Sequence, residues 1–248
     1  MISVIIGIHR FDNFVPEAIE SILGQTLSEL ELIIIANGKE CEAIEKEILL
    51  RYGKDSRVKV LKSTLAQLAH ALNLGIDHAR YEYIARMDAD DIAWPERLEK
   101  QLNYLHEHSL DLVGSDLRLI NERGDVLGVR SYPKGEHIAW KLRYKNCFAH
   151  NTILVKKHIL IEARGYNAGF NSEDYDLWLR LLRQNIAWDN MPLTLVDYRV
   201  HDAASQRRLL GYAESTALAM REFVLKKTAG HFFAILYHFT KALFRTRK

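Results

Sequence analysis

Short runs of apolar residues alternate with longer amphipathic stretches along the first part of the chain. The apolar runs are rich in β-branched residues and have no polar face, which is typical of strands buried on both sides. They cover residues 2–8, 30–36, 58–61 and 83–87, with helical periodicity between them, most clearly over 65–79. This repeated alternation predicts an α/β fold, with a mostly parallel central sheet and helices on both of its faces.

The pattern changes after about residue 110. Residues 111–120 and 126–131 flank the polar turn 121–125, an arrangement that predicts a hairpin. Further strands are expected at 153–155 and 193–200, and a helix at 174–182. We therefore expect a smaller antiparallel element to complete the domain.

A basic tail follows the predicted domain, which covers residues 1–215. Residues 221–248 carry seven Lys/Arg and a single acid, and apolar residues recur there at helical spacing. The apolar stripe is formed by Leu225, Ala229, Phe232, Leu236, Phe239 and Leu243. Over residues 216–248 we expect an amphipathic helix. It either packs on the domain or makes a peripheral contact with the anionic inner face of the cytoplasmic membrane.

The composition excludes several classes of protein. A net charge of +2, with 48% apolar and 27% charged residues, is typical of a soluble globular protein and does not indicate a nucleic-acid partner. The two cysteines, Cys41 and Cys147, are far apart and lack metal-ligand spacing. The N-terminus has no basic segment of a secretory signal, and no apolar run reaches the roughly 18 residues that span a bilayer. We therefore expect a cytoplasmic location.

Three aspartates, Asp88, Asp90 and Asp91, follow the strand predicted at 83–87. Clustered carboxylates repel one another unless a cation lies among them, and Mg2+ and Mn2+ prefer oxygen ligands combined with phosphates. Because ligands of parallel sheets bind at the carboxyl ends of strands, the pattern predicts a metal–diphosphate site. The alternative is a helix N-cap, since Pro95 suits the first turn of the next helix.

Seven segments, in this order, resemble the family 2 glycosyltransferases, which have the GT-A fold. They are residues 18–26, 31–35, 71–76, 83–91, 95–101, 173–180 and 198–201. The resemblance covers roughly residues 1–205 and implies a donor half over about 1–110 and an acceptor half over about 111–215. It also implies an inverting transfer of a sugar from a nucleoside-diphosphate donor to an acceptor hydroxyl.

The catalytic carboxylate is implied by the segment that begins Glu173-Asp174. Inversion requires a base that takes the acceptor proton during the attack. The resemblance favours Asp174 as this base and assigns Glu173 to the acceptor side. Both acids would also suit the N-terminus of a helix, where negative charge is favourable.

The same resemblance assigns the donor side. A Mn2+ or Mg2+ ion is implied, with Asp90 as the first choice for direct ligation, Asp88 near the ribose and the ion, and His201 completing the shell. Asp91 is expected to act as a helix cap. The implied nucleotide-sugar site comprises Ile8, His9, Arg10, Asn37, Gly38, Asn73, Arg86, Asp88, Ala89, Asp90 and Arg199. Arg207 and Arg208 either close over the diphosphate or are solvated.

Two loops depart from the family pattern. Ala36-Asn37-Gly38-Lys39 stands where Asp-Asp-Gly-Ser is common, so the acid that helps to read uracil is replaced by Asn37 or a backbone carbonyl. Gly7-Ile8-His9-Arg10 stands where Pro-x-Tyr-Asn is frequent, and Arg10 either contacts the nucleotide or is an exposed charge. A UDP-sugar remains the expected donor.

The expected reaction is a single addition to a growing bacterial cell-surface glycan, such as lipopolysaccharide O-antigen, lipooligosaccharide or capsule, with a lipid-linked acceptor as one form. Residues 206–210 lack the Gln-x-x-Arg-Trp motif of processive synthases. One alternative is a sugar nucleotidyltransferase, although the loop after residue 7 has too few glycines for one. Another is a non-catalytic nucleotide- or glycan-binding relative, which the altered 36–39 turn would suit.

Overall fold

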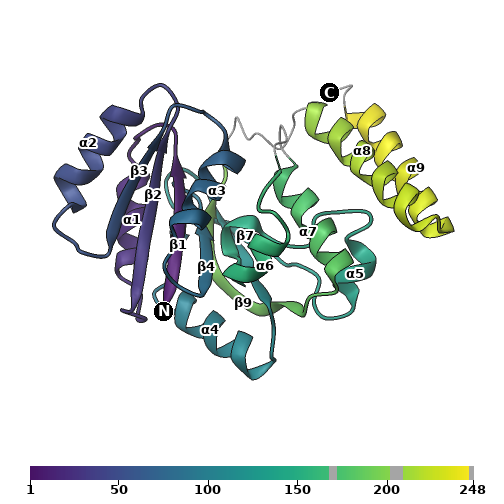
Figure 1. Cartoon of the computed structure of the whole chain (residues 1–248), viewed down its shortest axis with the longest axis horizontal. Coiled ribbons are helices and arrows are strands. Elements are labelled where there is room, and N and C mark those ends of the chain that lie inside the picture. Colours follow the sequence, from purple (N-terminus) through teal and green to yellow (C-terminus); the bar gives the residue numbers. More distant parts are fainter. Residues whose placement is uncertain (168–171, 202–208, 246–248) are drawn as a thin grey trace.

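The first half of the molecule alternates strands and helices, as the apolar pattern predicts (Figure 1). The computed structural model describes residues 1–167, 172–201 and 209–245. The first elements are β1 (Ile2–Ile8), α1 (Val15–Leu23), β2 (Leu30–Asn37), α2 (Cys41–Tyr52), β3 (Val58–Ser63), α3 (Leu68–His78) and β4 (Tyr83–Met87). Strands β3, β2, β1 and β4 are neighbours in this order and pair in parallel, so their carboxyl ends share one edge.

The second half extends the same sheet with mixed directions. Its elements are β5 (Ile92–Ala93), α4 (Arg97–Glu107), β6 (Leu112–Ile120), β7 (Val126–Arg130), α5 (His137–Lys141), the 3-10 turn η1 (His150–Thr152), β8 (Leu154–Lys156), α6 (Lys157–Glu162), α7 (Glu173–Gln184) and β9 (Trp188–Arg199). The sheet order continues β4-β8-β6-β9-β5, in which only β6 and β9 pair in parallel. Strand β7 pairs antiparallel with β6, which confirms the predicted hairpin.

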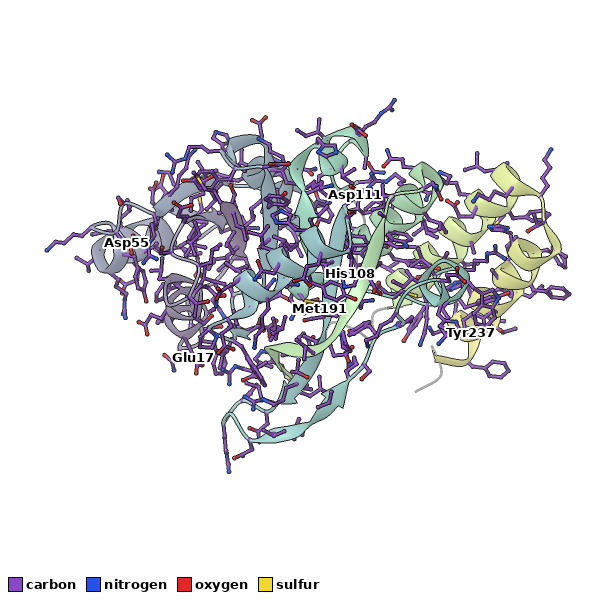
Figure 2. All side chains as sticks on the ribbon, turned by 90° about the horizontal axis from the view of Figure 1, so that it is seen from below. Glu17, Asp55, His108, Asp111, Met191 and Tyr237 are labelled. Carbon is purple, nitrogen blue, oxygen red and sulfur yellow. The ribbon has the colours of Figure 1, made fainter. Side chains whose placement is uncertain are left out.

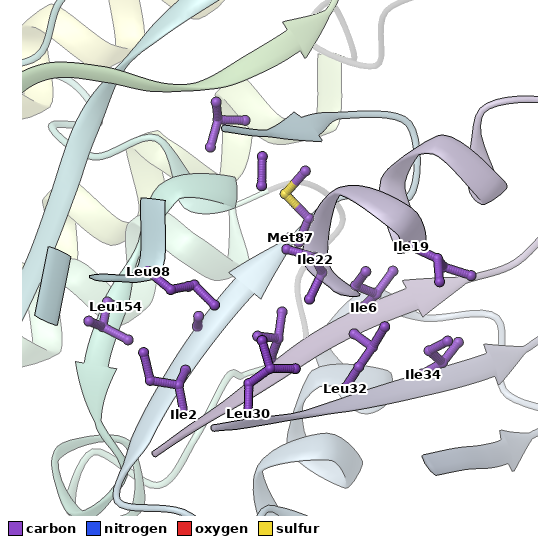
Figure 3. Packing of buried hydrophobic residues seen from close by; sticks show 14 of the residues in the cluster. Ile2, Ile6, Ile19, Ile22, Leu30, Leu32, Ile34, Met87, Leu98 and Leu154 are labelled. Carbon is purple, nitrogen blue, oxygen red and sulfur yellow. The ribbon is translucent and has the colours of Figure 1, made fainter. Parts of the chain in front are cut away.

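The core lies on both faces of this sheet because successive side chains of a strand point to opposite sides. On one face, Ile6 and Ile34 pack in a cluster with residues of α1, α2 and α4 (Figure 3). On the other face, Ile5 and Ile35 belong to a cluster with residues of α3, α6 and α7. The predicted arrangement of a central sheet between two helical layers is therefore confirmed.

The C-terminal segment is a helical hairpin and not the single helix predicted for it. Helix α8 (Leu209–Lys226) is followed by Lys227, whose φ of +46° lies in the left-handed region that ordinary residues avoid, and α9 (Ala229–Arg245) then turns back. The boundary predicted at residue 215 falls inside α8. The hairpin lies at one end of the long axis of the molecule, where Tyr237 is labelled, opposite Asp55 (Figure 2).

The apolar stripe predicted from helical spacing does not pack on the domain. Its α9 members, Phe232, Leu236, Phe239 and Leu243, are 45% to 52% exposed. The side chains of α9 that are buried include His231, Ala234 and His238, which occupy another face of the helix. In the part of the chain that the structure describes, every helix is too short or too polar to cross a membrane.

Candidate functional site

The three clustered aspartates lie where β4 ends, at the edge shared by the parallel strands. One ligand atom from each of Asp88, Asp90 and Asp91 lies within 4.8 Å of the others. Such a group of carboxylate oxygens fits a hard divalent cation. The three residues differ, however, in their burial and in their hydrogen-bond partners.

Asp91 is fully buried and anchors other segments. Its Oδ1 accepts from the backbone N–H of Arg199 at 2.9 Å, and its Oδ2 accepts from the side-chain amide of Asn151. Burial, together with the neighbouring aspartates, raises the pKa of this carboxyl well above its usual value. The helix-cap expectation for Asp91 was wrong, because strand β5 comes between the aspartates and α4, which begins at Arg97.

Asp90 is half exposed and faces His201. The Nε2 atom of His201 lies 2.8 Å from Asp90 Oδ2, and its Nδ1 atom lies 2.9 Å from Glu122 Oε1 in the β6–β7 turn. Partial burial lowers the pKa of His201, but the hydrogen bonds to Glu122 and Asp90 outweigh burial and raise it. The structure thus brings together Asp90 and His201, as predicted for a metal site, and adds Glu122, which the sequence did not single out.

Asp88 forms a partly buried ion pair with Arg86, whose Nη1 donates to Asp88 Oδ2 at 2.7 Å. Burial raises the pKa of the Asp88 carboxyl, although Arg86 opposes this effect. The Nε of Arg86 is buried and has no hydrogen-bond partner among the described residues. Arg86 therefore combines an ion pair with a buried donor that has no partner among the described residues.

Arg97 of α4 is hydrogen-bonded to the end of β4 from which the aspartates follow. Its guanidinium donates to the backbone carbonyl of Arg86 at 2.8 Å and to the side chain of Gln101 at 3.0 Å. Gln101 in turn donates to the carbonyl of Thr152. Complete burial lowers the pKa of Arg97 to about 9. The segment around Arg97 therefore fixes the end of β4 from which the aspartates extend.

Arg199 connects the aspartate loop to three other segments. Its Nε donates to the carbonyl of Asp90 at 2.9 Å, and its Nη2 donates to Glu17 of α1 at 2.6 Å. Its Nη1 donates to two carbonyls of the β6–β7 turn, and the guanidinium lies 4.2 Å over the ring of Phe14. Each guanidinium nitrogen already has a partner, so the geometry favours a scaffold role for Arg199 over the predicted contact with the nucleotide.

The second pair of acids opens helix α7. Asp174 Oδ2 accepts from the side-chain amide of Asn146 at 2.5 Å, and Oδ1 accepts from the backbone N–H of Tyr175 at 2.7 Å. Burial raises the pKa of Asp174, and burial together with Asp174 raises the pKa of Glu173. The next acid, Asp176, is instead neutralised by ion pairs with arginines.

A cavity of about 740 Å³ is lined by Asp88 of the first group of acids and by both acids of the second. Arg86 and Asp88 line one part of it, and Glu173 and Asp174 line another. Its wall also includes His150, whose pKa is lowered well below the usual value by burial and by Arg86, so the ring is neutral. The arrangement can hold a charged donor group and an ionisable carboxylate around one substrate-sized space.

The first loop and the β2 turn lie at the same edge of the sheet. Ile8 is buried, while His9 and Arg10 are exposed, and Arg10 pairs with Asp12 at 3.1 Å. Asn37 is buried at the end of β2, and Gly38 takes a φ of +92° in the turn. The donor-binding roles predicted here stay predictions, as does that of the half-buried Ala89.

Asn73 has a structural task in α3. Its side-chain amide donates to the carbonyl of Tyr166 at 2.8 Å, and its Oδ1 accepts from the N–H of the same residue. Both polar atoms are therefore committed to the loop before α7, which disfavours the predicted contact with the donor. Arg207 and Arg208 lie outside the described residues.

Sequence reasoning missed Glu122 and Asn146. Each contacts a predicted functional side chain from a segment distant in sequence, and no motif marks it. The sequence placed Glu122 in the predicted 121–125 turn but indicated no functional role for it. Nothing comparable marked Asn146.

Comparisons with known proteins agree with this geometry. Residues 3–175 match the sequence model of glycosyl transferase family 2. The chain is 47% identical over 99% of its length to the O-antigen biosynthesis glycosyltransferase WbnJ of Escherichia coli, 97% of which is covered. It is 29% identical, also over 99% of its length, to the amylovoran biosynthesis glycosyltransferase AmsE of Erwinia amylovora, of which 94% is covered.

The fold is also similar to that of a solved structure, S. aureus TarS 1–349. The TM-score is 0.72 at 16% sequence identity, over 99% of this chain and 73% of that one. A second TarS structure, in complex with UDP-GlcNAc, gives a TM-score of 0.70 at 14% identity, over 90% of this chain and 66% of that one. From the match over residues 3–175 and the identity to WbnJ, the chain belongs to glycosyl transferase family 2 and is a glycosyltransferase with the GT-A fold.

Proposed function

We propose that this enzyme is an inverting, metal-dependent glycosyltransferase that adds one sugar from a nucleoside-diphosphate donor to a glycan hydroxyl. The observation that carries the proposal is the cavity lined both by Arg86 and Asp88 and by Glu173 and Asp174. It offers a cation, Arg86, and one proposed metal ligand, Asp88, for a diphosphate, and a partly buried carboxylate, Asp174, for an acceptor. The structural neighbour in complex with UDP-GlcNAc supports a UDP-sugar as the first donor to test.

Asp174 is the group we assign to proton transfer. The acceptor oxygen attacks the anomeric carbon, its proton passes to the Asp174 carboxylate, and the bond between the carbon and the diphosphate oxygen breaks. One displacement of this kind inverts the anomeric centre. The amide of Asn146 and the backbone N–H of Tyr175 orient the carboxylate, and burial gives it a raised pKa that improves it as a base.

Asp90, Asp88 and His201 are the residues that would hold a Mn2+ or Mg2+ ion. Their fit rests on the close approach of the carboxylate oxygens and on His201 Nε2, which lies 2.8 Å from Asp90. A bound ion of this kind supplies positive charge to the leaving nucleoside diphosphate. Arg86 adds a second cation at the same end of the cavity, beside Asp88.

The glycan under construction is proposed to be a bacterial cell-surface polysaccharide. The names of the relatives from E. coli and Erwinia amylovora, which refer to O-antigen and to amylovoran, support this class. The glycan hydroxyl would have to approach Asp174, which lies at the N-terminus of α7 in the proposed acceptor half and lines the cavity.

The donor assignment is tested by thermal unfolding with UDP in the presence and absence of Mn2+. We expect UDP to raise the melting temperature only when the metal is present, and slow hydrolysis of a UDP-sugar to be lost in Asp174→Ala. Stabilisation by UDP that is equal with metal and with EDTA would contradict the metal-dependent site. Hydrolysis unchanged in Asp174→Ala would remove Asp174 as the base.

We further propose that the exposed face of α9 contacts an anionic phospholipid surface. The face exposes Phe232, Leu236, Phe239 and Leu243, and the exposed Lys226 and Lys227 precede it. A helix with an apolar stripe and flanking lysines is typical of those that lie in the headgroup region of an anionic membrane. This contact would bring the enzyme to a lipid-linked acceptor.

The membrane contact is tested by sedimentation with phosphatidylglycerol vesicles. The native protein should pellet with them, whereas Phe232→Ser/Phe239→Ser should remain in the supernatant. Leu49→Ser/Leu50→Ser is the matched control, because these two exposed leucines lie on α2. Equal pelleting of the α9 variant and the native protein would rule out this surface.

A further inference from the structure

We infer that the hairpin of α8 and α9 forms a wall of the reaction cavity and that this wall recognises a negatively charged group on the acceptor. The inference rests on the proposed function and specifies the acceptor for the same site. Five residues of the hairpin line the cavity that contains Asp174: Gly211, Tyr212, Ser215, His238 and Lys241. The segment predicted to be a separate tail is therefore part of the site.

The hairpin is held firmly against the helix that carries the base. Arg221 of α8 forms an ion pair with Asp176 of α7, and Arg183 of α7 forms one with Glu222 of α8. His238 of α9 is a further link, because its Nε2 lies 3.0 Å from the carbonyl of Arg143 in the loop after α5. A wall that is fixed in this way can select a substrate instead of merely adapting to it.

The acceptor wall carries positive charge. Besides Arg86, three cations line the cavity from three segments, Arg130 at the end of β7, Lys145 before η1 and Lys241 on α9. The carboxylates that line the same cavity are Asp88, Glu173 and Asp174, and the proposed function already uses these at the donor end and at the base. Burial lowers the pKa of His238, so this ring adds no charge. An acceptor that contacts this wall therefore meets cations.

The position of these cations relates the charge to the reacting hydroxyl. Lys145 is adjacent in sequence to Asn146, whose amide holds the carboxylate of Asp174. Lys145 is exposed, and neither it nor Arg130 forms an ion pair with another described residue. An anionic group bound here would lie close to the acceptor hydroxyl that Asp174 deprotonates.

Aromatic rings orient two of the cations. The Nζ of Lys241 lies 5.9 Å from the ring centre of Tyr212, and the guanidinium of Arg130 lies 5.9 Å from that of Tyr198. All four residues line the cavity. A cation that rests on an aromatic face loses less freedom when it binds an anion. The chemistry selected is a phosphate or a sugar carboxylate attached to the acceptor.

The experiment uses the full chain with saturating UDP and Mg2+, so that a phosphate cannot bind at the donor end. Three probes are titrated by calorimetry or protein-observed NMR: N-acetylglucosamine 1-phosphate, methyl glucuronide and methyl glucoside. We expect one or both anionic probes to bind about tenfold more tightly than methyl glucoside, a difference of about 1.4 kcal/mol. The two anionic probes distinguish a phosphate from a carboxylate as the recognised group.

The matched variants assign the preference to this wall. Lys145→Met/Lys241→Met should abolish it and leave the affinity for UDP within twofold of the native value. Lys46→Met/Lys54→Met, two exposed lysines in α2 and the loop after it, should retain it. Equal binding of all three probes by the native protein, or an anion preference that survives in Lys145→Met/Lys241→Met, would overturn the inference. UDP binding is titrated first, without the probes. A protein that does not bind UDP would contradict the proposed donor, independently of the result for the anionic probes.

Discussion

The two groups of acids differ in what surrounds them, although Asp88 of the first group and Glu173 and Asp174 of the second line one cavity. The aspartates after β4 lie among cationic and proton-donating partners, with Arg86 on Asp88 and His201 on Asp90. The pair that opens α7 has no ion pair among the described residues, and Asp174 is held only by an amide and a backbone N–H. These surroundings support the proposal that the first group holds a cation and that Asp174 takes a proton.

The two groups differ because their surroundings favour different forms of the carboxyl: Arg86 favours the ionised form at Asp88, and burial favours the protonated form at Asp174. Arg86 stabilises the ionised form of Asp88, while burial disfavours it, and a divalent ion would shift the balance further towards ionisation. At Asp174 burial dominates over the hydrogen bonds and raises the pKa. A carboxylate that binds protons more readily than usual is a better base.

The largest effect is expected for Asp174→Asn. This substitution preserves the size of the side chain and removes the proton acceptor, so transfer should fall about 10²- to 10⁴-fold. Because the donor end is untouched, the metal-dependent affinity for UDP should remain within about twofold. The measurement pairs a product assay with UDP titration, and a variant that keeps more than a tenth of native activity would refute the assignment.

The next effect separates Asp91 from Asp90. Asp91→Ala leaves the N–H of Arg199 and the amide of Asn151 without their buried acceptor, which should cost about 2 kcal/mol of unfolding free energy. Asp90→Ala, at a half-exposed side chain, should cost less than about 1 kcal/mol yet abolish stabilisation by metal and UDP. The free energies of unfolding of both variants are measured in urea. Equal losses of unfolding free energy would contradict a structural role for Asp91 that Asp90 does not share.

A smaller effect is expected for Glu122→Gln. Glu122 contacts the Nδ1 atom of His201 and fixes the ring that faces Asp90, so its charge should matter for metal binding. Replacement of a carboxylate behind a metal-binding histidine lowers affinity 10- to 100-fold, and the exposure of Glu122 favours the lower end, about tenfold. Mn2+ affinity is measured by electron paramagnetic resonance. As a control, Glu96→Gln on the exposed surface should leave it unchanged.

The smallest effect concerns pH. The pKa of Asp174 is raised in the folded protein, so its contribution to stability is present at low pH and is lost as pH rises through the shifted pKa. Asp174→Asn should therefore be more stable than the native protein at neutral pH, and the gain should shrink on acidification. Melting temperatures from pH 4 to pH 8 test this sign. A gain that grows towards low pH would mean that the pKa is lowered instead.

The apolar pattern was sufficient for the sheet and for the positions of both groups of acids. Ile2–Ile8, Leu30–Asn37 and Tyr83–Met87 form strands close to the predicted bounds, because β-branched runs without a polar face are stable only inside a sheet. The same reasoning indicated the helix near Pro95, which the structure has at Arg97–Glu107, but it did not detect the two-residue strand β5 before that helix, so the cap role given to Asp91 was wrong. A strand this short is defined by its pairing with β9 and has no periodicity of its own.

The C-terminal segment shows where pattern reasoning ends. Helical spacing correctly indicated a stripe of apolar residues, but it gave no information on whether the stripe faces the domain. In the structure Phe232 and Phe239 are exposed, and Lys227 divides the segment into two helices. Periodicity reports that a helix has two faces, whereas the choice of the face that packs depends on the shape of the surface opposite.

Local order along the chain thus determined the α/β class, the parallel sheet and the edge at which the aspartates lie, because these depend on patterns of neighbouring residues. The tertiary structure alone decided that Asp90 meets His201, that Asn146 holds Asp174 and that Lys241 lines the same cavity as Asp174. These contacts join residues that are distant in sequence. Their partners are selected by the packing of whole elements, which no local pattern records.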